Sequence, residues 1–378
     1  MNNATKQRRS QFLDIARLLA ALAVCAGHLR SVLFEHYADI IEPTFSQKIF
    51  YGVTSLGHES VVIFFVLSGY FVGGSILLNP LNINWLTYLH SRLIRLWVVL
   101  IPAHLLTACV DGGLSFFYPD VISGNYNERW MSGPRGDGIV HGALVLVGNA
   151  LFQQTVFVPI FGTNSPLWSL ANEFYYYIMF PLLAATAGVL PCVTSQMHRG
   201  IYGVCVCITF LLLPSGFIVG FTFFCAGAGI SFLTQSGLLS RSRHILNLPL
   251  EILLFALLVW MAKSSYFRNE HCNDFLTAAE FSLFLMCSFP YFGSFPGRHS
   301  ARFVFPDMSY SIYLSHFPCV LVIGAMFATK TPLSAHPLEI GLYISLLSTI
   351  LVYSYIFWRM FERNTPWVRS HFSQYFSK

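Results

Sequence analysis

The sequence predicts an all-α integral membrane protein, a polytopic bundle of about ten transmembrane helices with both termini in the cytoplasm. Of the 378 residues, 55% are hydrophobic and only 10% are charged, and the mean hydropathy is +0.59. A soluble domain carries about 25% charged residues. Apolar stretches long enough to cross about 30 Å of hydrocarbon also recur along the whole chain. Both observations favour membrane helices over a soluble core.

The apolar stretches can be placed in order. The first follows a polar, basic start and has no small-residue cleavage pattern, so we expect a retained span and not a signal peptide. Two short stretches in the middle of the chain meet at Pro214-Ser215-Gly216, which is a turn signal. The spans are expected near residues 11–34, 57–79, 91–111, 167–190, 200–214, 216–234, 247–263, 275–292, 306–328 and 338–361.

The longest segment between predicted spans covers residues 112–166. Within it, residues 138–156 are apolar but contain Asn149, Gln153 and Gln154, so we interpret them as a re-entrant or interfacial helix. A loop this long is more often functional than filler, and we expect it to face outward and help to close a site. The predicted organisation is a cytoplasmic N-terminal tail (1–10), a transmembrane domain (11–361) and a cytoplasmic C-terminal tail (362–378).

The distribution of lysine and arginine predicts the orientation, because short cytoplasmic loops carry an excess of both. With ten spans, the side of the N-terminus has fourteen of these residues and the opposite side has seven, while Arg17 lies within the first span. An eleventh crossing at 138–156 would invert every later loop and remove this bias. The isoelectric point near 8.7 therefore reflects cytoplasmic loops and not nucleic-acid binding.

An arginine and a histidine lie inside the first predicted span. Ionisable groups in membrane helices are expensive, so each one is a candidate functional residue. Arg17 and His28 are eleven residues apart, which at roughly 100° per residue puts them on one helical face, about 16 Å apart along the axis. A neutral imidazole can take a proton from a hydroxyl near neutral pH, as acyl transfer to an alcohol requires. The alternative is a histidine that only hydrogen-bonds between helices.

A pair of arginines begins the third predicted span, in the run Ser91-Arg92-Leu-Ile-Arg95. Arginines at i and i+3 share one helical face, and their planar guanidinium groups bind phosphates bidentately. A nucleotide-bearing donor such as coenzyme A would supply those phosphates. The alternative is ordinary anchoring of a cytoplasmic helix end.

A third group of residues begins the fourth predicted span. Pro166 suits a helix start, and Trp168 with the tyrosines after it suits a membrane interface. Glu173 lies about one turn into the span, on the outer side where His28 is also expected. A carboxylate there could orient or charge-stabilise an imidazole, as the third member of a catalytic triad does. The alternative is an acidic residue favoured by the helix dipole.

Two hydroxyl-bearing runs complete the candidates. In the second predicted span, Ser68 and Gly69 permit close helix packing. In the ninth, Tyr310, Tyr313 and His316 belong to one hydroxyl-rich run of eight residues. A hydroxyl in such a run could bind a sugar or a pantetheine amide, or simply hydrogen-bond to a neighbouring helix.

Several common chemistries are not indicated. The sequence lacks GxSxG, HExxH, GxxxxGK and GxGxxG motifs, which argues against serine-hydrolase, zincin, P-loop and Rossmann chemistry. Its nine cysteines form no CxxC pair and indicate neither a disulfide framework nor a zinc site. We predict no bound metal and no permanently bound cofactor.

In this order, the motifs resemble the acyltransferase-3 family of polytopic membrane acyltransferases, a bacterial group that O-acetylates lipopolysaccharide, capsule and exopolysaccharide sugars. The family's Arg/Lys-x10-His motif matches Arg17 to His28, and its Arg-x-x-Arg motif matches Arg92 to Arg95. The resemblance runs from residue 13 to residue 316. It also includes Phe64-Phe65-Val-Leu-Ser68-Gly69-Tyr70, Trp168-Ser169-Leu-Ala-Asn-Glu173 and Ser309-Tyr310-Ser-Ile-Tyr313-Leu-Ser-His316.

The resemblance implies a membrane O-acyltransferase, with O-acetyl transfer as the family default. The donor would be acyl-CoA, used as a substrate from the cytoplasm, and the acceptor a hydroxyl of an extracytoplasmic polysaccharide or glycolipid. The expected location is the bacterial inner membrane, with lipid as a partner and no nucleic acid. The residues implied are His28 as catalytic histidine, Glu173 as its carboxylate, Arg17, Arg92 and Arg95 for the donor, and, for substrate, Ser68, Trp168, Tyr310, Tyr313 and His316.

Two other functions fit the buried charges. A glycolipid transporter or flippase could use His28, Arg17 and Glu173 as a proton or substrate relay, and it would need no acyl-CoA. A non-catalytic scaffold is the third possibility, although such a relative would be free to lose these residues. Several points stay open at this stage: the acyl group, the sugar and its hydroxyl position, the side of the membrane on which the acceptor binds, the oligomeric state, and the choice between an acyl-histidine and direct transfer.

Overall fold

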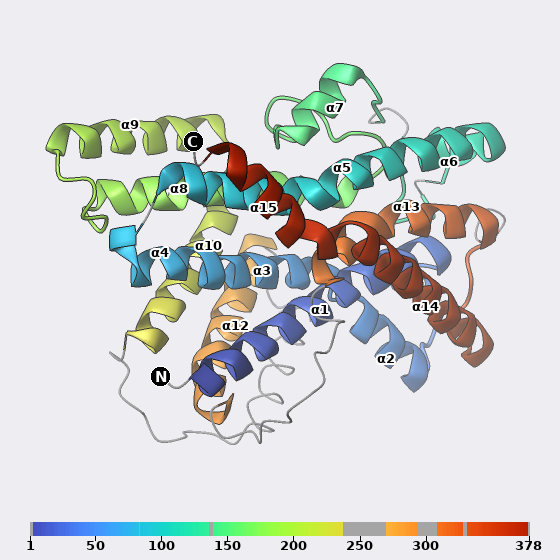
Figure 1. The fold of residues 1–378 in the computed structure, drawn as a ribbon. Coiled ribbons are helices and arrows are strands. Elements are labelled where there is room, and N and C mark those ends of the chain that lie inside the picture. Colours follow the sequence, from blue (N-terminus) through green and yellow to red (C-terminus); the bar gives the residue numbers. More distant parts are fainter. Residues whose placement is uncertain are drawn as a thin grey trace. The chain divides into compact units, whose positions relative to one another are not determined.

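The computed structural model describes residues 3–82, 84–126, 128–135, 139–236, 270–292, 308–327 and 331–376, and these residues form helices and connections with no strand beyond isolated bridges (Figure 1). The principal helices are α1 (Asn3–Leu33), α2 (Phe45–Thr54), α3 (Gly57–Ser68), the π-helix η2 (Gly69–Gly73), α4 (Gly74–Leu78), α5 (Trp85–Phe117), α6 (Pro119–Ile122), α7 (Ala143–Ala150), η5 (Ser165–Leu167), α8 (Trp168–Thr186), α9 (Gln196–Leu212), α10 (Ser215–Gln235), α12 (Glu270–Phe292), α13 (Ser309–Phe327), α14 (Pro337–Met360), η7 (Glu362–Asn364) and α15 (Thr365–Phe376).

Six helical segments among the described residues are long and apolar enough to cross a membrane: Phe12–Leu33, Phe45–Leu78, Trp85–Phe117, Ser215–Gln235, Ser309–Phe327 and Pro337–Phe372. Six of the ten spans predicted from the sequence fall on these segments. Helices α8, α9 and α12 coincide with three more, but they do not reach the same combination of length and hydropathy. The predicted span 247–263 lies outside the described residues. The all-helical prediction is confirmed, whereas the count of ten and the side of the termini stay predictions.

The chain forms two compact units, each of which is described by itself. The first contains the described parts of Met1–Arg17, Val61–Trp85 and Asn172–Pro306. The second contains those of Leu18–Ser60, Leu86–Ala171 and Asp307–Lys378. Helices α1, α3, α5 and α8 contribute residues to both units.

In the first unit, α10 packs directly against the segment formed by α3, η2 and α4. Glycines make this possible, because a Cβ on Gly69 would lie 1.8 Å from the carbonyl oxygen of Phe224, and one on Gly227 would lie 1.9 Å from that of Val66. The expectation of close packing at Gly69 is therefore confirmed. Small residues that let helix backbones meet are the usual means of helix association in lipid.

In the second unit, α13 is the central element and is buried along most of its length. Its N-terminus is capped by Glu362, whose Oε2 accepts hydrogen bonds from the backbone N–H (3.0 Å) and hydroxyl (2.6 Å) of Ser311. Further along, a Cβ on Gly324 would lie 2.2 Å from Val32 on α1. The hydroxyl of Tyr343 on α14 donates to the carbonyl of Ala26 at 2.9 Å, so α1, α13 and α14 pack together.

A proline within α13 is matched by a side chain from a distant loop. Pro318 has no N–H, so the carbonyl of Leu314 loses its ordinary helical partner. The amide of Asn164 replaces that donor, with Nδ2 lying 3.0 Å from the Leu314 carbonyl oxygen. The segment before η5 is thereby attached to the middle of α13.

The connection between α5 and α8 is shorter than the loop 112–166 predicted from the sequence, because α5 continues as a helix to Phe117. The connection contains α7, whose eight residues are only about 12 Å long and cannot cross the hydrocarbon.

Candidate active site

His28 lies in the second unit, near the C-terminal end of α1. Its ring faces His316, with centroids 5.4 Å apart and planes inclined by 31°, and it meets the edge of Phe317 at 5.1 Å. The Nδ1 atom of His28 is buried and has no hydrogen-bond partner among the described residues. A buried nitrogen without a partner is unusual, and it suits a group that exchanges a proton with a substrate.

The second imidazole, that of His316, is fully buried. Its Nδ1 lies 2.9 Å from the carbonyl oxygens of both Ile312 and Tyr313. Carbonyls only accept, so Nδ1 carries the proton and Nε2 holds a lone pair. Within the described part of the chain, Nε2 has no hydrogen-bond partner. The structure thus places two imidazoles side by side in apolar surroundings, each with a nitrogen left for chemistry.

Glu173 and Ser68 meet in the first unit. The Ser68 hydroxyl donates to Oε1 of Glu173 at 2.8 Å, the Tyr177 hydroxyl donates to the same oxygen, and the two hydroxyl oxygens are 3.1 Å apart. Tyr177 follows Glu173 by four residues and so lies on the same face of α8. The carboxylate is therefore held in one orientation by two hydroxyl groups. Its expected role toward His28 stays a prediction, because the two residues belong to different units.

The arginines that are predicted to bind the acyl-CoA donor are also divided between the two units. Arg17 lies on α1 in the first unit, with its guanidinium 5.7 Å from the ring centroid of Phe71. Arg92 and Arg95 lie on α5 in the second, and Arg92 sits 5.6 Å from the ring of Tyr88. Cation–π contacts of this kind hold a guanidinium group over a ring without neutralising its charge.

A third arginine joins this pair, and the sequence analysis missed it. Arg369 on α15 donates from Nη2 to the carbonyl of Ser91 at 3.3 Å, and its guanidinium interacts electrostatically with those of Arg92 and Arg95. Three like charges drawn from two helices form a natural site for an anion with several negative groups. In the sequence, Arg369 is only one of the fourteen lysines and arginines expected on the side of the N-terminus, because nothing in its local sequence shows which helix it approaches.

An apolar cavity of about 380 Å³ lies between α5 and α15. It is lined by His90, Ile94, Trp97, Val98, Val368 and Phe372. The two helices that line it also carry Arg92, Arg95 and Arg369, which suits a ligand that is anionic at one end and apolar at the other.

The remaining predicted substrate residues lie in the second unit. Tyr313 donates its hydroxyl to the carbonyl of Pro166 at 3.0 Å and lies 2.6 Å from the Ser169 hydroxyl. Tyr310 donates to the carbonyl of Leu96 at 3.3 Å, one residue after Arg95. Both hydroxyls therefore have protein partners, while Trp168, the first residue of α8, keeps about a third of its surface exposed.

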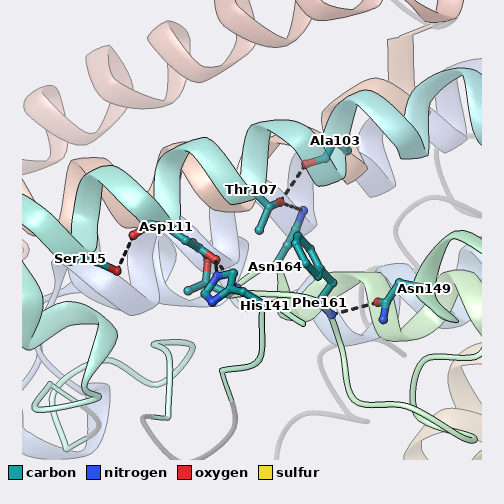
Figure 2. A network of polar contacts seen from close by, with 9 residues as sticks. Ala103, Thr107, Asp111, Ser115, His141, Asn149, Phe161 and Asn164 are labelled. Carbon is teal, nitrogen blue, oxygen red and sulfur yellow. Dashed lines mark hydrogen bonds and ion pairs between the residues drawn. The ribbon is translucent and has the colours of Figure 1, made fainter. Parts of the chain in front are cut away.

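The structure also shows a polar cluster that the sequence analysis did not single out. Asp111 on α5 is paired with His141 and accepts a hydrogen bond from the hydroxyl of Thr163. The next residue, Asn164, donates to the hydroxyl of Thr107 on α5 (Figure 2). The sequence contained a signal for it: an aspartate inside an apolar helix. Among the described residues, no group of three or more histidines, cysteines or acidic residues is arranged to hold a metal ion.

The family of the chain follows from comparison with known proteins. The family model of an acyltransferase domain, acyltransferase-3, matches residues 10–359, and the chain belongs to this family. An O-acetyl transferase of Shigella phage Sf6 is 22% identical over 380 residues, which is 94% of this chain and 96% of that protein. The acyltransferase MdmB of Streptomyces mycarofaciens is 31% identical over 166 residues, covering 44% of this chain and 37% of that protein. No solved structure matches the chain.

These similarities, together with the six helices of the described residues that could cross a membrane, fit a multi-pass membrane protein that is an O-acyltransferase. The resemblance inferred from the motifs is thereby confirmed at the level of the family and the enzyme class.

Proposed function

We propose that the protein transfers an acyl group, most simply acetyl, from acyl-CoA to a sugar hydroxyl of a polysaccharide or glycolipid outside the cytoplasm. The single observation that carries this proposal is the pairing of His28 with His316, which provides two nitrogens without partners inside an apolar helical unit. We further propose a bacterial inner membrane location with both termini in the cytoplasm.

The chemistry assigned to His28 balances without an external proton. Its imidazole takes the hydroxyl proton as the sugar oxygen attacks the thioester carbonyl carbon, the carbon–sulfur bond breaks, and the thiolate receives the proton from the imidazolium. An alternative route passes the acyl group through an acyl-imidazole on His28. His316, with its proton fixed on Nδ1, offers Nε2 as a second base beside the reacting histidine.

We assign the binding of the acyl-CoA donor to the arginine side chains. Arg92, Arg95 and Arg369 would hold the phosphates of CoA, and the apolar cavity between α5 and α15 would accommodate a less polar part of the same molecule. Arg17 lies on the same helix as His28 and is proposed as a further donor contact. Glu173, oriented by Ser68 and Tyr177, is proposed as the catalytic carboxylate.

The test is transfer of labelled acetyl from acetyl-CoA into cell-envelope carbohydrate. Membranes would contain, at matched expression, wild type, His28→Ala, His316→Ala or His336→Ala, the last an exposed histidine at the start of α14 that serves as the control. We expect transfer by the control, a loss of about 10²-fold or more for His28→Ala, and an intermediate loss for His316→Ala.

The outcomes separate the possible mechanisms. Equal label with and without His28 would remove this residue from the chemistry. No label with wild type, repeated with other acyl-CoA donors, would contradict the transferase and favour glycolipid transport through the same helices. Label that stays on the protein at residue 28 when the acceptor is withheld would select the acyl-imidazole route.

A further inference from the structure

A buried carboxylate and a partly exposed imidazole form a pair that the proposed mechanism does not use. Asp111 is 1% exposed, and its Oδ2 lies 2.7 Å from Nε2 of His141, whose side chain is 39% exposed. The carboxylate also accepts hydrogen bonds from Thr163, at 2.9 Å from the backbone N–H and at 2.5 Å from the hydroxyl. Figure 2 shows Asp111 on α5 with His141 beside it. All these residues belong to the second unit.

The contact with Asp111 determines which nitrogen of His141 can meet a ligand. An ionised carboxylate only accepts, so Nε2 must be the donor, and in the neutral ring Nδ1 then carries the lone pair. Among the described residues, Nδ1 of His141 has no hydrogen-bond partner. The same relation between a buried aspartate and an imidazole fixes the tautomer and the orientation of the base in catalytic triads.

The surrounding backbone is shaped to hold this pair. Gly162 has a φ of +63°, and a Cβ there would lie 2.4 Å from Oδ2 of Asp111 and 3.3 Å from Nε2 of His141, so only glycine lets the loop come so close. The N–H of Gly162 donates to the carbonyl of Val140 at 3.0 Å, and the His141 ring meets the edge of Phe161 at 5.7 Å. The imidazole is therefore held by Asp111 and Phe161, while part of it stays exposed.

The pair is anchored to the same short segment as the histidines of the candidate active site. Thr163 binds Asp111, and the next residue, Asn164, donates to Leu314 on α13, two residues before His316. Asn164 also lies 3.3 Å from the Thr107 hydroxyl, one turn before Asp111 on α5 (Figure 2). Two consecutive residues thus connect the Asp111–His141 pair to the helix of the His28–His316 pair.

We propose that His141, oriented by Asp111, is a hydroxyl-binding residue for the carbohydrate acceptor, with Nδ1 accepting a hydrogen bond from a sugar hydroxyl. Asp111 acts as a positioning residue through His141. This inference rests on the proposed function, since it takes the acceptor to be a sugar. It differs from a purely structural role, in which the pair only attaches the loop to α5.

Two substitutions at one position separate these roles. In His141→Gln, the amide Nε2 can still donate to Asp111, but no acceptor remains where Nδ1 was. In His141→Asn, Oδ1 stands near the place of Nδ1, but the side chain no longer reaches Asp111. Thr163→Val is the matched control, because it removes a hydroxyl bond to Asp111 and leaves the imidazole in place.

The measurement is the KM for carbohydrate extracted from the envelope of the expressing cells, together with the KM for acetyl-CoA. We expect His141→Gln to raise the carbohydrate KM about threefold to tenfold, with the acetyl-CoA KM unchanged. His141→Asn should recover part of the loss, and Thr163→Val, which leaves the imidazole its carboxylate partner, should raise the carbohydrate KM less than His141→Gln does. An unchanged carbohydrate KM for His141→Gln, or equal increases for His141→Gln and Thr163→Val, would overturn the proposal in favour of loop attachment alone.

A second readout does not need turnover. Diethyl pyrocarbonate modifies accessible imidazole nitrogens, and its rate at each histidine can be followed by peptide mass spectrometry. We expect the envelope carbohydrate to slow modification of His141 but not of the exposed His336, and free CoA to protect neither. Protection without acyl transfer would contradict only the proposed function, whereas transfer without protection of His141 would contradict only this inference.

Discussion

At the scale of single residues, the second unit is defined by polar groups whose partners come from far along the chain. Asn164 supplies the donor that Pro318 withholds from Leu314, and its own side chain is completely buried. A buried carbonyl that loses its only donor retains the full cost of its desolvation. The packing of α13, and with it the position of His316, therefore depends on an amide side chain 150 residues earlier in the sequence.

This dependence can be tested with a double-mutant cycle. Asn164→Ala should lower the free energy of unfolding by about 1–3 kcal/mol, because the Leu314 carbonyl loses its donor. In a Pro318→Ala background the new N–H can bond to that carbonyl, so the same substitution should cost about 1 kcal/mol less. Thermal unfolding in detergent measures both. Equal costs in the two backgrounds would show that Asn164 does not act through Leu314.

At the scale of elements, the first unit depends on helices that meet through their backbones. The π-helix η2 separates α3 from α4, and α10 crosses this region where Gly69 and Gly227 leave no room for a side chain. Single turns of π-helix within longer helices are frequent at functional sites. Here Ser68, which binds Glu173, is the last residue before that turn.

Two glycines of α10 provide a matched comparison. Gly227→Ala should lower the free energy of unfolding by about 3 kcal/mol or more, since the new methyl group would overlap the Val66 carbonyl. Gly229→Ala, two residues later, meets nothing within 4 Å and should stabilise the helix by up to about 1 kcal/mol. Thermal unfolding of the two variants is the measurement. A similar loss of unfolding free energy in both variants would mean that glycine is needed for helix flexibility and not for close packing.

At the scale of the whole molecule, the fold brings together charged residues that are far apart in the sequence. Arg369 belongs to the last helix, yet it contacts the carbonyl of Ser91 and stands with Arg92 and Arg95. Like charges repel, so such a cluster is most stable when an anion shares it. Under the proposed function, that anion is the phosphate group of the donor.

The arginine cluster leads to a prediction about donor affinity. Arg369→Ala should raise the KM for acetyl-CoA about threefold to tenfold and leave the carbohydrate KM unchanged, because one charge-assisted contact is lost. Arg359→Ala, on the exposed end of α14, is the control and should change neither constant. The effect of Arg369→Ala should shrink at high salt, where exposed charges are screened. An unchanged acetyl-CoA KM would assign Arg369 to helix docking alone.

Many residues of the candidate site could be predicted from the sequence because they belong to local sequence patterns. Apolar runs predicted the helices, since a helix in lipid must be apolar over its whole length. The spacing of Arg17 and His28 and of Arg92 and Arg95 marked candidate residues, because helical periodicity converts spacing into a shared face. The motifs in their order were enough to indicate the acyltransferase family, which the comparison with known proteins confirmed.

Other features were decided only by the tertiary structure. The sequence predicts a substrate contact for His316, but nothing in its local sequence shows that its ring lies beside that of His28. The approach of Arg369 to α5 and the pairing of Asp111 with His141 join residues 278 and 30 positions apart. The physical reason is that local sequence determines which face of a helix is polar, whereas the choice of partner for that face depends on how all the helices pack at once.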